Sequence, residues 1–300
     1  MKPVRPRGAK PQIPYSLSKI TKETLFPRHP GFDSIRVIAG KPFADRAEMK
    51  NMISNSKLEK NVRIFDDEKQ MLKFMIEKWE NISHERIERR GYFTVGLSGG
   101  KTPIVFYQKL AEWDNKSFWK RTHVFLVDER FVPFENEDSN YRMLRETLLG
   151  RIPIPQENIH PIPTEKVSLE ASAREYEKDL ESFFKVSKGQ FPDFDLILLG
   201  IGEDGHTASL FPGSRGLSER RRLTAAVVVD GTRHDRITLT LQVINHAEHV
   251  IFIVTGANKA PVLKKIIAGD DPSLPASMVK PGSGRLLFVI DREASSQLYA

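Results

Sequence analysis

A glycine-rich loop that carries two acidic residues and a histidine holds the strongest chemical signal in this 300-residue chain. The loop, Gly200–Gly213, directly follows the apolar run Leu196–Leu199 and contains Glu203, Asp204 and His206. A short apolar run between polar residues is typical of a strand buried on both faces of a parallel sheet, and the loops beyond such strands line ligand crevices. Because a neutral imidazole accepts a proton readily near pH 7, we expect this histidine to act as a base. We call this segment the histidine loop.

A second polar loop offers a place for a phosphate group. It follows the predicted strand Phe93–Leu97 and precedes a predicted helix. Its members are Ser98, Gly99, Gly100, Lys101 and Thr102, which we call the glycine loop. Free backbone N–H groups at a helix N-terminus, two hydroxyls and a lysine suit a phosphate monoester. The spacing is not that of a P-loop, and an ordinary tight turn between a strand and a helix can have the same composition.

Three cations near predicted strand ends are candidates for binding an anionic substrate. Arg130 follows Asp128 and Glu129 at the end of a predicted strand, where it can act as a bidentate anion binder. The same three residues can equally form a surface ion-pair cluster; if they do not, Asp128 is a further candidate for contacting the substrate. Arg236 precedes one predicted strand and Lys259 follows another, so each either contacts substrate or is simply solvated.

Two other interpretations of these glycines have weaker support. Gly96–Gly100 matches the Gly-x-Ser-x-Gly nucleophile elbow, which would make Ser98 a nucleophile and His206 its base. Asp204, only two residues from the histidine, is awkwardly placed to orient that ring in such a triad. Gly200–Gly205 matches a dinucleotide-binding fingerprint, but a Pro-Gly pair soon afterwards interrupts the long helix that the fingerprint should open. We therefore favour neither interpretation.

Composition and spacing exclude several other classes of site. The chain has no cysteine, which excludes disulfides, thiolate catalysis and zinc-thiolate sites. Its histidines show no metal-ligand spacing, so we expect no metal. No apolar run approaches the roughly 18 residues of a membrane-spanning helix. With 39% hydrophobic and 28% charged residues, the chain has the composition of a soluble globular protein.

The net charge of +7 is concentrated at the start of the chain. Residues 1–31 hold seven Lys/Arg, one Glu and six prolines, so the rest of the chain is nearly neutral. We expect a poorly ordered, basic leader at 1–60 and no basic nucleic-acid-binding face on the folded part. The leader is either an organellar targeting segment or a solvated tail or contact arm.

The remaining residues, 61–300, are predicted to form one α/β domain. The expected strands are Phe93–Leu97, His123–Val127, Phe194–Leu199, Ala225–Val229, Ile237–Leu241, Val250–Val254 and Leu286–Ile290. The expected helices are Glu68–Arg90, Pro103–Trp113, Ser139–Leu149 with Ser139 as its cap, Leu169–Phe184 and Lys259–Ala268. Strands that alternate with helices predict βαβ units with right-handed crossovers around a mostly parallel sheet flanked by helices.

Several segments together resemble the 6-phosphogluconolactonase family, part of the glucosamine/galactosamine-6-phosphate isomerase superfamily. They are Leu97–Pro103, Val127–Pro133, Asp138–Tyr141, Pro153–His160, Leu198–Gly213, Arg236–Thr240 and Val254–Lys259. The set covers roughly residues 62–293 and is far more specific than any one of its pieces.

The resemblance implies a Rossmann-like fold and hydrolysis of 6-phospho-D-glucono-1,5-lactone to 6-phospho-D-gluconate in the oxidative branch of the pentose phosphate pathway, without a metal or organic cofactor. It implies that His206 activates water and that Asp204 holds or polarises the groups around it. The phosphate would rest on the glycine loop with Arg130 as a clamp, and Lys259 or Arg236 would stabilise the developing oxyanion.

Two competing functions stay open at this point. Glucosamine-6-phosphate deaminases usually carry a further acid after the Gly-His pair, which Thr207–Pro212 lacks, and tend to have an aromatic residue at the position of Arg130. A regulator that only binds a sugar phosphate would have little need for a base. We expect a small-molecule sugar phosphate lactone as the ligand, no specific nucleic acid and no membrane, a monomer or weak homo-oligomer, and a cytoplasmic location unless the leader directs the protein to an organelle.

Overall fold

The computed structural model describes residues 61–113, 115–229, 234–282 and 284–298, so the predicted leader lies outside the described residues. Seven parallel strands form one sheet in the order β1-β10-β9-β6-β2-β3-β5. They are β1 (Asn61–Phe65), β2 (Phe93–Leu97), β3 (Thr122–Leu126), β5 (Ile159–His160), β6 (Leu196–Leu199), β9 (His249–Val254) and β10 (Arg285–Asp291). The predicted parallel α/β sheet is confirmed.

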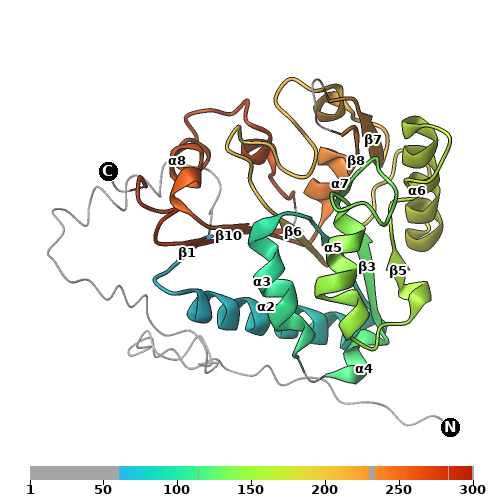
Figure 1. Ribbon diagram of the computed structural model, residues 1–300, viewed down its shortest axis with the longest axis horizontal. Coiled ribbons are helices and arrows are strands. Elements are labelled where there is room, and N and C mark those ends of the chain that lie inside the picture. The colour runs from blue at the N-terminus through green and yellow to red at the C-terminus, as the bar shows by residue number, and fades with distance from the viewer. Residues whose placement is uncertain (1–60, 114, 230–233, 283, 299–300) are drawn as a thin grey trace, which may run out of the picture. The chain divides into compact units, whose positions relative to one another are not determined.

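Helices lie on both sides of this sheet, as Figure 1 shows with α2 on one side of β1, β10 and β6 and α8 on the other. The α-helices are α2 (Glu68–Arg90), α3 (Lys101–Ala111), α4 (Lys116–Trp119), α5 (Asn140–Thr147), α6 (Leu169–Phe184), α7 (Leu241–His246) and α8 (Ala260–Ala268). Short 3-10 helices are η1 (Leu149–Arg151), η2 (Gln156–Asn158), η3 (Arg215–Ser218), η4 (Ala257–Lys259) and η5 (Pro275–Met278).

Short polar side chains set where three of these helices begin. Asp67 accepts a hydrogen bond from the backbone N–H of Gln70 at the start of α2, and Ser168 caps α6 in the same way. Ser139, the predicted cap, accepts from the backbone N–H of Arg142 at the start of α5. Each cap satisfies a backbone donor that the helix itself leaves without a partner.

Three strands outside the parallel sheet form a small antiparallel sheet in the order β4-β8-β7. They are β4 (Asp128–Arg130), β7 (Thr224–Val227) and β8 (Arg236–Leu239). In their register Arg130 lies opposite Arg236 and Asp128 lies opposite Thr238. This pairing brings together two segments that are about a hundred residues apart in the chain.

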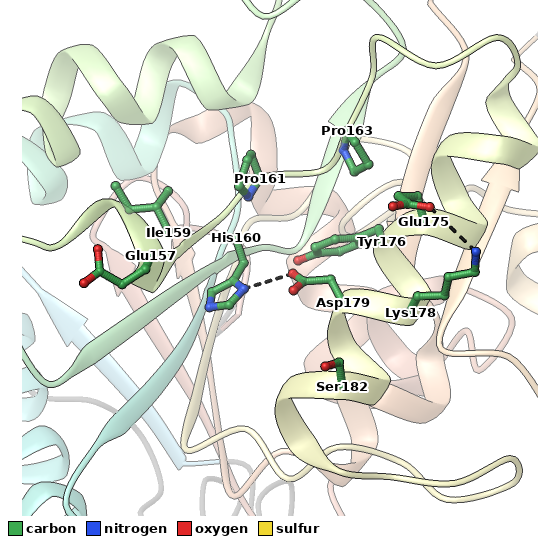
Figure 2. A pocket seen from close by; sticks show the side chains of 10 residues that line it. All are labelled: Glu157, Ile159, His160, Pro161, Pro163, Glu175, Tyr176, Lys178, Asp179 and Ser182. Carbon is green, nitrogen blue, oxygen red and sulfur yellow. Dashed lines mark hydrogen bonds and ion pairs between the residues drawn. The ribbon is translucent and has the colours of Figure 1, made fainter.

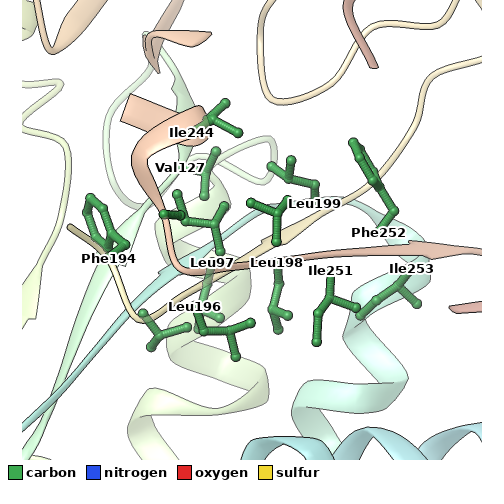
Figure 3. Close-up of a cluster of buried hydrophobic side chains, with 14 of the residues drawn as sticks. Leu97, Val127, Phe194, Leu196, Leu198, Leu199, Ile244, Ile251, Phe252 and Ile253 are labelled. Atoms are coloured by element: carbon green, nitrogen blue, oxygen red, sulfur yellow. The ribbon is translucent and has the colours of Figure 1, made fainter. Parts of the chain in front are cut away.

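The core lies on both faces of the central strands. Every residue of β2, β6 and β9 is buried, as expected for parallel strands covered by helices on both sides. Figure 3 shows Leu199 and Phe252 on the same side of these strands as Ile244 of α7, whereas Ile251 and Ile253 point to the opposite side. The rigid centre of the sheet therefore supports the loops that follow β2, β6 and β9.

The structure differs from the sequence-based elements in several places. Strands β1 and β5 and helices α4 and α7 were not predicted. The predicted strand Ile237–Leu241 ends earlier, because the chain turns at Thr240 and Leu241 begins α7. Asp128–Arg130 is not the end of the preceding strand but a separate strand, β4, that pairs with β8. The predicted helix at Pro103–Trp113 begins at Lys101 and ends at Ala111.

Candidate active site

The histidine and glycine loops meet where the strand order of the sheet reverses. The chain proceeds from β2 to β3 and β5 on one side, whereas β6 pairs with the other side of β2 and leads on to β9 and β10. In open α/β sheets the crevice at such a switch point, beyond the carboxyl ends of the strands, is where ligands bind. The Ser98 hydroxyl donates a hydrogen bond to the carbonyl of Leu198 at 2.7 Å and joins the two strand ends.

Within the histidine loop, the Asp204 carboxylate is hydrogen-bonded directly to the imidazole ring of His206. Asp204 Oδ1 lies 2.5 Å from His206 Nδ1 and also accepts the His206 backbone N–H at 3.1 Å. A tight turn makes this possible: the Gly202 N–H donates to the His206 carbonyl at 2.8 Å, and Gly205 has a φ of +80°, which suits glycine. The expectation that an acid two residues away is awkwardly placed to orient the ring is wrong.

The charge of this pair fixes which ring nitrogen is basic. Partial burial opposes ionisation of Asp204, but the charge of His206 and the hydrogen bonds from its backbone and ring outweigh burial and lower the Asp204 pKa. The ionised carboxylate can only accept hydrogen bonds, so Nδ1 carries the proton and Nε2 has the free lone pair. His206 has 30% of its side chain exposed and packs against the Phe211 ring, so a solvent water can reach it.

Gly202 provides the space that the Asp204–His206 pair occupies. A Cβ atom at this position would lie 2.1 Å from His206 Nδ1 and 2.6 Å from Asp204 Oδ1. Both separations are far below any contact that real Cβ atoms make. A side chain at Gly202 would therefore displace the pair, which makes this glycine part of the site although it touches no substrate.

The glycine loop joins β2 to the N-terminus of α3, as predicted. Gly100, with a φ of +109°, directly precedes the helix, and Lys101 is exposed in its first turn. Thr102 receives a hydrogen bond from Thr255, which follows β9, at 3.3 Å. Because the Ser98 hydroxyl donates to the carbonyl of Leu198 and is buried, it is not available to a phosphate or as a nucleophile for His206. Ser98 therefore holds the loop in place, and the backbone N–H groups, Lys101 and the Thr102 hydroxyl are the donors that remain for a phosphate.

Arg130 contacts the glycine loop through Asn140, a residue that the sequence analysis did not single out. The Arg130 guanidinium donates to Asn140 Oδ1 and, at 3.0 Å, to the carbonyl of Asp138. A Cβ atom on Gly99 would lie 1.8 Å from Asn140 Oδ1, so the glycine and the amide are packed tightly together. Arg130 is thereby held beside the loop predicted to bind phosphate.

Asp128 connects β4 to the histidine loop. Its Oδ2 accepts a hydrogen bond from Ser209 Oγ at 2.6 Å, and its backbone carbonyl accepts from Asn140. Both Asp128 and Glu129 are buried, which rules out the alternative of a surface ion-pair cluster. Arg236 lies opposite Arg130 in the β4–β8 register, so two of the predicted cations share this side of the site.

Lys259 lies in the loop after a different strand, β9. It ends η4 and directly precedes α8. Its neighbour Asn258 donates a hydrogen bond to Glu203 Oε1 at 2.6 Å, which joins this loop to the histidine loop. The structure thus places Lys259 on the β9 side and Arg130 on the β3 side, with β6 and β2 between them.

A second histidine–aspartate pair lies in a shallow pocket beside β5 and α6, of about 510 Å³. Figure 2 shows His160 and Asp179 there, with His160 Nδ1 2.9 Å from Asp179 Oδ2. The ring is stacked on Phe125, and its other nitrogen lies 3.4 Å from His123 Nδ1. Both ring nitrogens of His160 face protein groups. This pair therefore has the same residue types as Asp204–His206 but lacks a ring nitrogen that is free to act as a base.

In the described part of the chain, no group of three or more His, Cys, Asp or Glu residues is arranged to hold a metal ion. Nor is any described helix both long and apolar enough to cross a bilayer.

The model of one protein family, the glucosamine-6-phosphate isomerases/6-phosphogluconolactonase family, matches residues 66–288. The chain belongs to this family. The matched span includes the glycine loop, β4, the histidine loop and Lys259.

Similar proteins of known name point to one branch of the family. The 6-phosphogluconolactonase of Synechocystis sp. is 44% identical over 214 residues, which cover 71% of this chain and 87% of that protein. The protein named 6-phosphogluconolactonase 3, chloroplastic, of Arabidopsis thaliana is 36% identical and covers 80% and 75% of the two chains. The solved 6-phosphogluconolactonase from Trypanosoma cruzi matches with a TM-score of 0.72 and 31% identity, over 80% of this chain and 97% of that one.

Proposed function

We propose that this protein hydrolyses 6-phospho-D-glucono-1,5-lactone to 6-phospho-D-gluconate, the reaction of the oxidative branch of the pentose phosphate pathway, with His206 as the general base. The observation that carries this proposal is the hydrogen bond that His206 Nδ1–H donates to Asp204, which leaves Nε2 basic at the switch point beside the glycine loop. The 6-phosphogluconolactonase relatives supply the substrate class.

The chemistry needs one base that later acts as an acid. His206 Nε2 takes a proton from a water molecule as the water oxygen forms a bond to the C1 carbonyl carbon of the lactone. The bond between C1 and the ring oxygen then breaks, and the imidazolium returns its proton to that oxygen. Asp204 stabilises the imidazolium between the two steps and keeps the ring oriented. The acid that forms releases its proton to solvent.

The phosphate group of the substrate binds at the glycine loop. The backbone N–H groups of Gly99, Gly100 and the first turn of α3 face it, with the helix dipole favouring its negative charge. Arg130 clamps it from the β3 side, and Thr102 and Lys101 add a hydroxyl and a charge. This anchoring positions C1 near His206, which lies on the neighbouring strand end.

The remaining cations bind the carbonyl end of the substrate or the far side of the phosphate. Lys259 lies in the loop joined to the histidine loop, and Arg236 lies beside Arg130. A cation near the C1 oxygen stabilises negative charge that develops only in the transition state, so its loss lowers kcat. A cation on the phosphate binds ground state and transition state alike, so its loss raises KM. Kinetics of Lys259→Ala and Arg236→Ala therefore assign the two roles.

The direct test follows loss of fresh lactone by NMR with the protein and with buffer alone, because the lactone also hydrolyses without an enzyme. Faster loss with the protein supports the proposal. A rate equal to the buffer blank contradicts it, and the same preparation is then tested for release of ammonia from glucosamine 6-phosphate. Binding of the sugar phosphate without turnover of either compound would instead indicate a regulator.

We further propose that the protein acts as a monomer or weak homo-oligomer, binds no specific nucleic acid, and works in the cytoplasm or, if residues 1–60 are a targeting segment, in an organelle. Light scattering gives the oligomeric state. Microscopy of the full chain and of a chain that begins at residue 61, each fused to a fluorescent protein, tests the targeting role. The same distribution for both fusions would contradict it.

A further inference from the structure

Glu129 takes no part in the mechanism above, yet it lies fully buried next to Arg130, with none of its surface exposed. Its carboxylate accepts hydrogen bonds from four donors. Oε1 accepts the backbone N–H groups of Arg130 and Asn140, each at 2.7 Å. Oε2 accepts the backbone N–H of Tyr141 at 2.7 Å and the hydroxyl of Ser139 at 3.1 Å.

The donors come from two elements, β4 and α5, and Glu129 accepts hydrogen bonds from both. Arg130 ends β4, whereas Ser139, Asn140 and Tyr141 form the start of α5. A buried carboxylate is costly to ionise, and burial raises the pKa of Glu129 to about 7 although the three backbone N–H groups lower it. An apolar side chain at this position would avoid that cost but would leave these backbone donors without a partner.

The residues whose backbones Glu129 holds are those that contact the glycine loop. The side chain of Asn140 accepts from the Arg130 guanidinium and donates to the carbonyl of Asp128 at 2.9 Å. Gly99 packs so closely on the same amide that a single added carbon would clash with it. Glu129 therefore holds the backbones of Arg130 and Asn140 in place, and through these two residues it supports the glycine loop.

We infer that Glu129 is a positioning residue that fixes the Arg130–Asn140 pair against the glycine loop and so sets the affinity of the site for the phosphate group of its substrate. The inference rests on the proposed function, because it takes the glycine loop and Arg130 as the phosphate site. The hydrogen-bond partners of the Glu129 carboxylate lie in β4 and at the start of α5 rather than in the histidine loop, so the chemical step is left to Asp204 and His206.

The test replaces Glu129 by glutamine, which keeps the shape but exchanges one accepting oxygen for a donor. Binding of inorganic phosphate to wild type and Glu129→Gln is measured by calorimetry at pH 8, and steady-state kinetics with the lactone are measured in parallel. We expect phosphate affinity to fall and KM to rise by about tenfold, the size of losing a charge-assisted hydrogen bond, with kcat within about twofold of wild type.

Glu135→Gln is the matched control. Glu135 lies in the same connection between β4 and α5 and pairs with Arg145 of α5 through two bonds of 2.7 Å, so its carboxylate is bonded to α5 at a residue other than Asn140. This control makes the same chemical change to an acid that also holds α5. We expect its phosphate affinity, KM and kcat to equal those of wild type.

A double-mutant cycle separates positioning from a general loss of structure. If Glu129 acts through Arg130, adding Glu129→Gln to Arg130→Ala raises KM no further, whereas independent effects would multiply. Should Glu129→Gln not fold, Asn140→Ala removes the contact with Arg130 and keeps the backbone bonds to Glu129, and we expect the same rise in KM.

The outcomes for the two claims are distinguishable. The inference is overturned if the wild type hydrolyses the lactone but Glu129→Gln has the same phosphate affinity and KM as Glu135→Gln. The proposed function is then left intact. A fall in kcat with KM unchanged, or full additivity with Arg130→Ala, also overturns the inference. A wild type that binds phosphate but does not hydrolyse the lactone contradicts the proposed function, and the phosphate titration of Glu129→Gln still decides the role of Glu129.

Discussion

Asp204 and Glu129 are both carboxylates of the candidate site, and the fold gives them opposite surroundings. Asp204 is half exposed, pairs with an imidazole, and has a lowered pKa. Glu129 is fully buried, faces backbone and hydroxyl donors, and has a pKa raised to about 7. An acid that supports proton transfer must stay ionised next to a partner whose charge changes, whereas an acid that holds backbone groups can be buried away from substrate. The comparison separates a chemical region around the histidine loop from a binding region around β4, α5 and the glycine loop.

The largest effect is expected from His206→Ala, which removes the base. We expect kcat to fall by about 10²- to 10⁴-fold, the usual contribution of a general base, with KM and thermal stability close to wild type. NMR of lactone loss, corrected for the buffer rate, measures it. If His206→Ala keeps the wild-type kcat, His206 is not the general base and the histidine loop is not the chemical region.

Asp204→Asn should lower kcat by about 10²-fold, because an amide that donates to Nδ1 moves the proton to Nε2 and removes the free lone pair. Asp179→Asn is the control, since it makes the same change in the other Asp–His pair, beside β5 and α6 (Figure 2). We expect the control to keep wild-type kcat and KM. Equal losses in both variants would mean that the effect is one of folding rather than of base orientation.

Alanine substitutions at Gly202 and Gly99, one glycine in each region, should change different kinetic constants. Gly202→Ala places a carbon 2.1 Å from His206 Nδ1 and should lower kcat by about tenfold or more. Gly99→Ala places one 1.8 Å from Asn140 Oδ1 and should raise KM by about tenfold.

Gly282→Ala is the control for both glycine variants, because no atom lies within 4 Å of its added carbon. Steady-state kinetics with the lactone compare the three proteins. If both clashing variants change the same kinetic constant, the division into a chemical and a binding region does not hold.

The last expected effect is on stability rather than on kinetics, and it is a change in the free energy of unfolding with pH. Because the Glu129 pKa is raised in the folded state, folding takes up a proton between the ordinary glutamate pKa and about 7, so stability falls as pH rises through that range and is constant above it. At 1.36 kcal/mol per pKa unit, wild type should lose up to roughly 3 kcal/mol relative to Glu129→Gln between pH 4.5 and 8. Urea unfolding at both pH values measures the difference, and a rise in the relative stability of wild type with pH would contradict the assignment.

The sequence was sufficient to predict the parallel sheet and the loops at its edge, because β2, β6 and β9 are short apolar runs that end in glycine or polar residues. It was not sufficient for contacts made by backbone geometry. The Asp204–His206 bond depends on the turn at Gly202–Gly205, and the role of Glu129 depends on donors that α5 supplies. The register that places Arg130 opposite Arg236 joins two strands far apart in the chain, which no local pattern reveals. Asn140 lies within a segment that resembles the family, but its contacts with Gly99 and Arg130 depend on the fold and could not be predicted from that segment.

The most direct test of this division measures kcat and KM for His206→Ala and Glu129→Gln side by side, in one NMR assay of lactone hydrolysis at pH 8. We predict that His206→Ala has a lower kcat with an unchanged KM, whereas Glu129→Gln has a higher KM with an unchanged kcat. Loss of kcat in both variants, or an unchanged KM in Glu129→Gln, would contradict the separation of chemistry from phosphate binding.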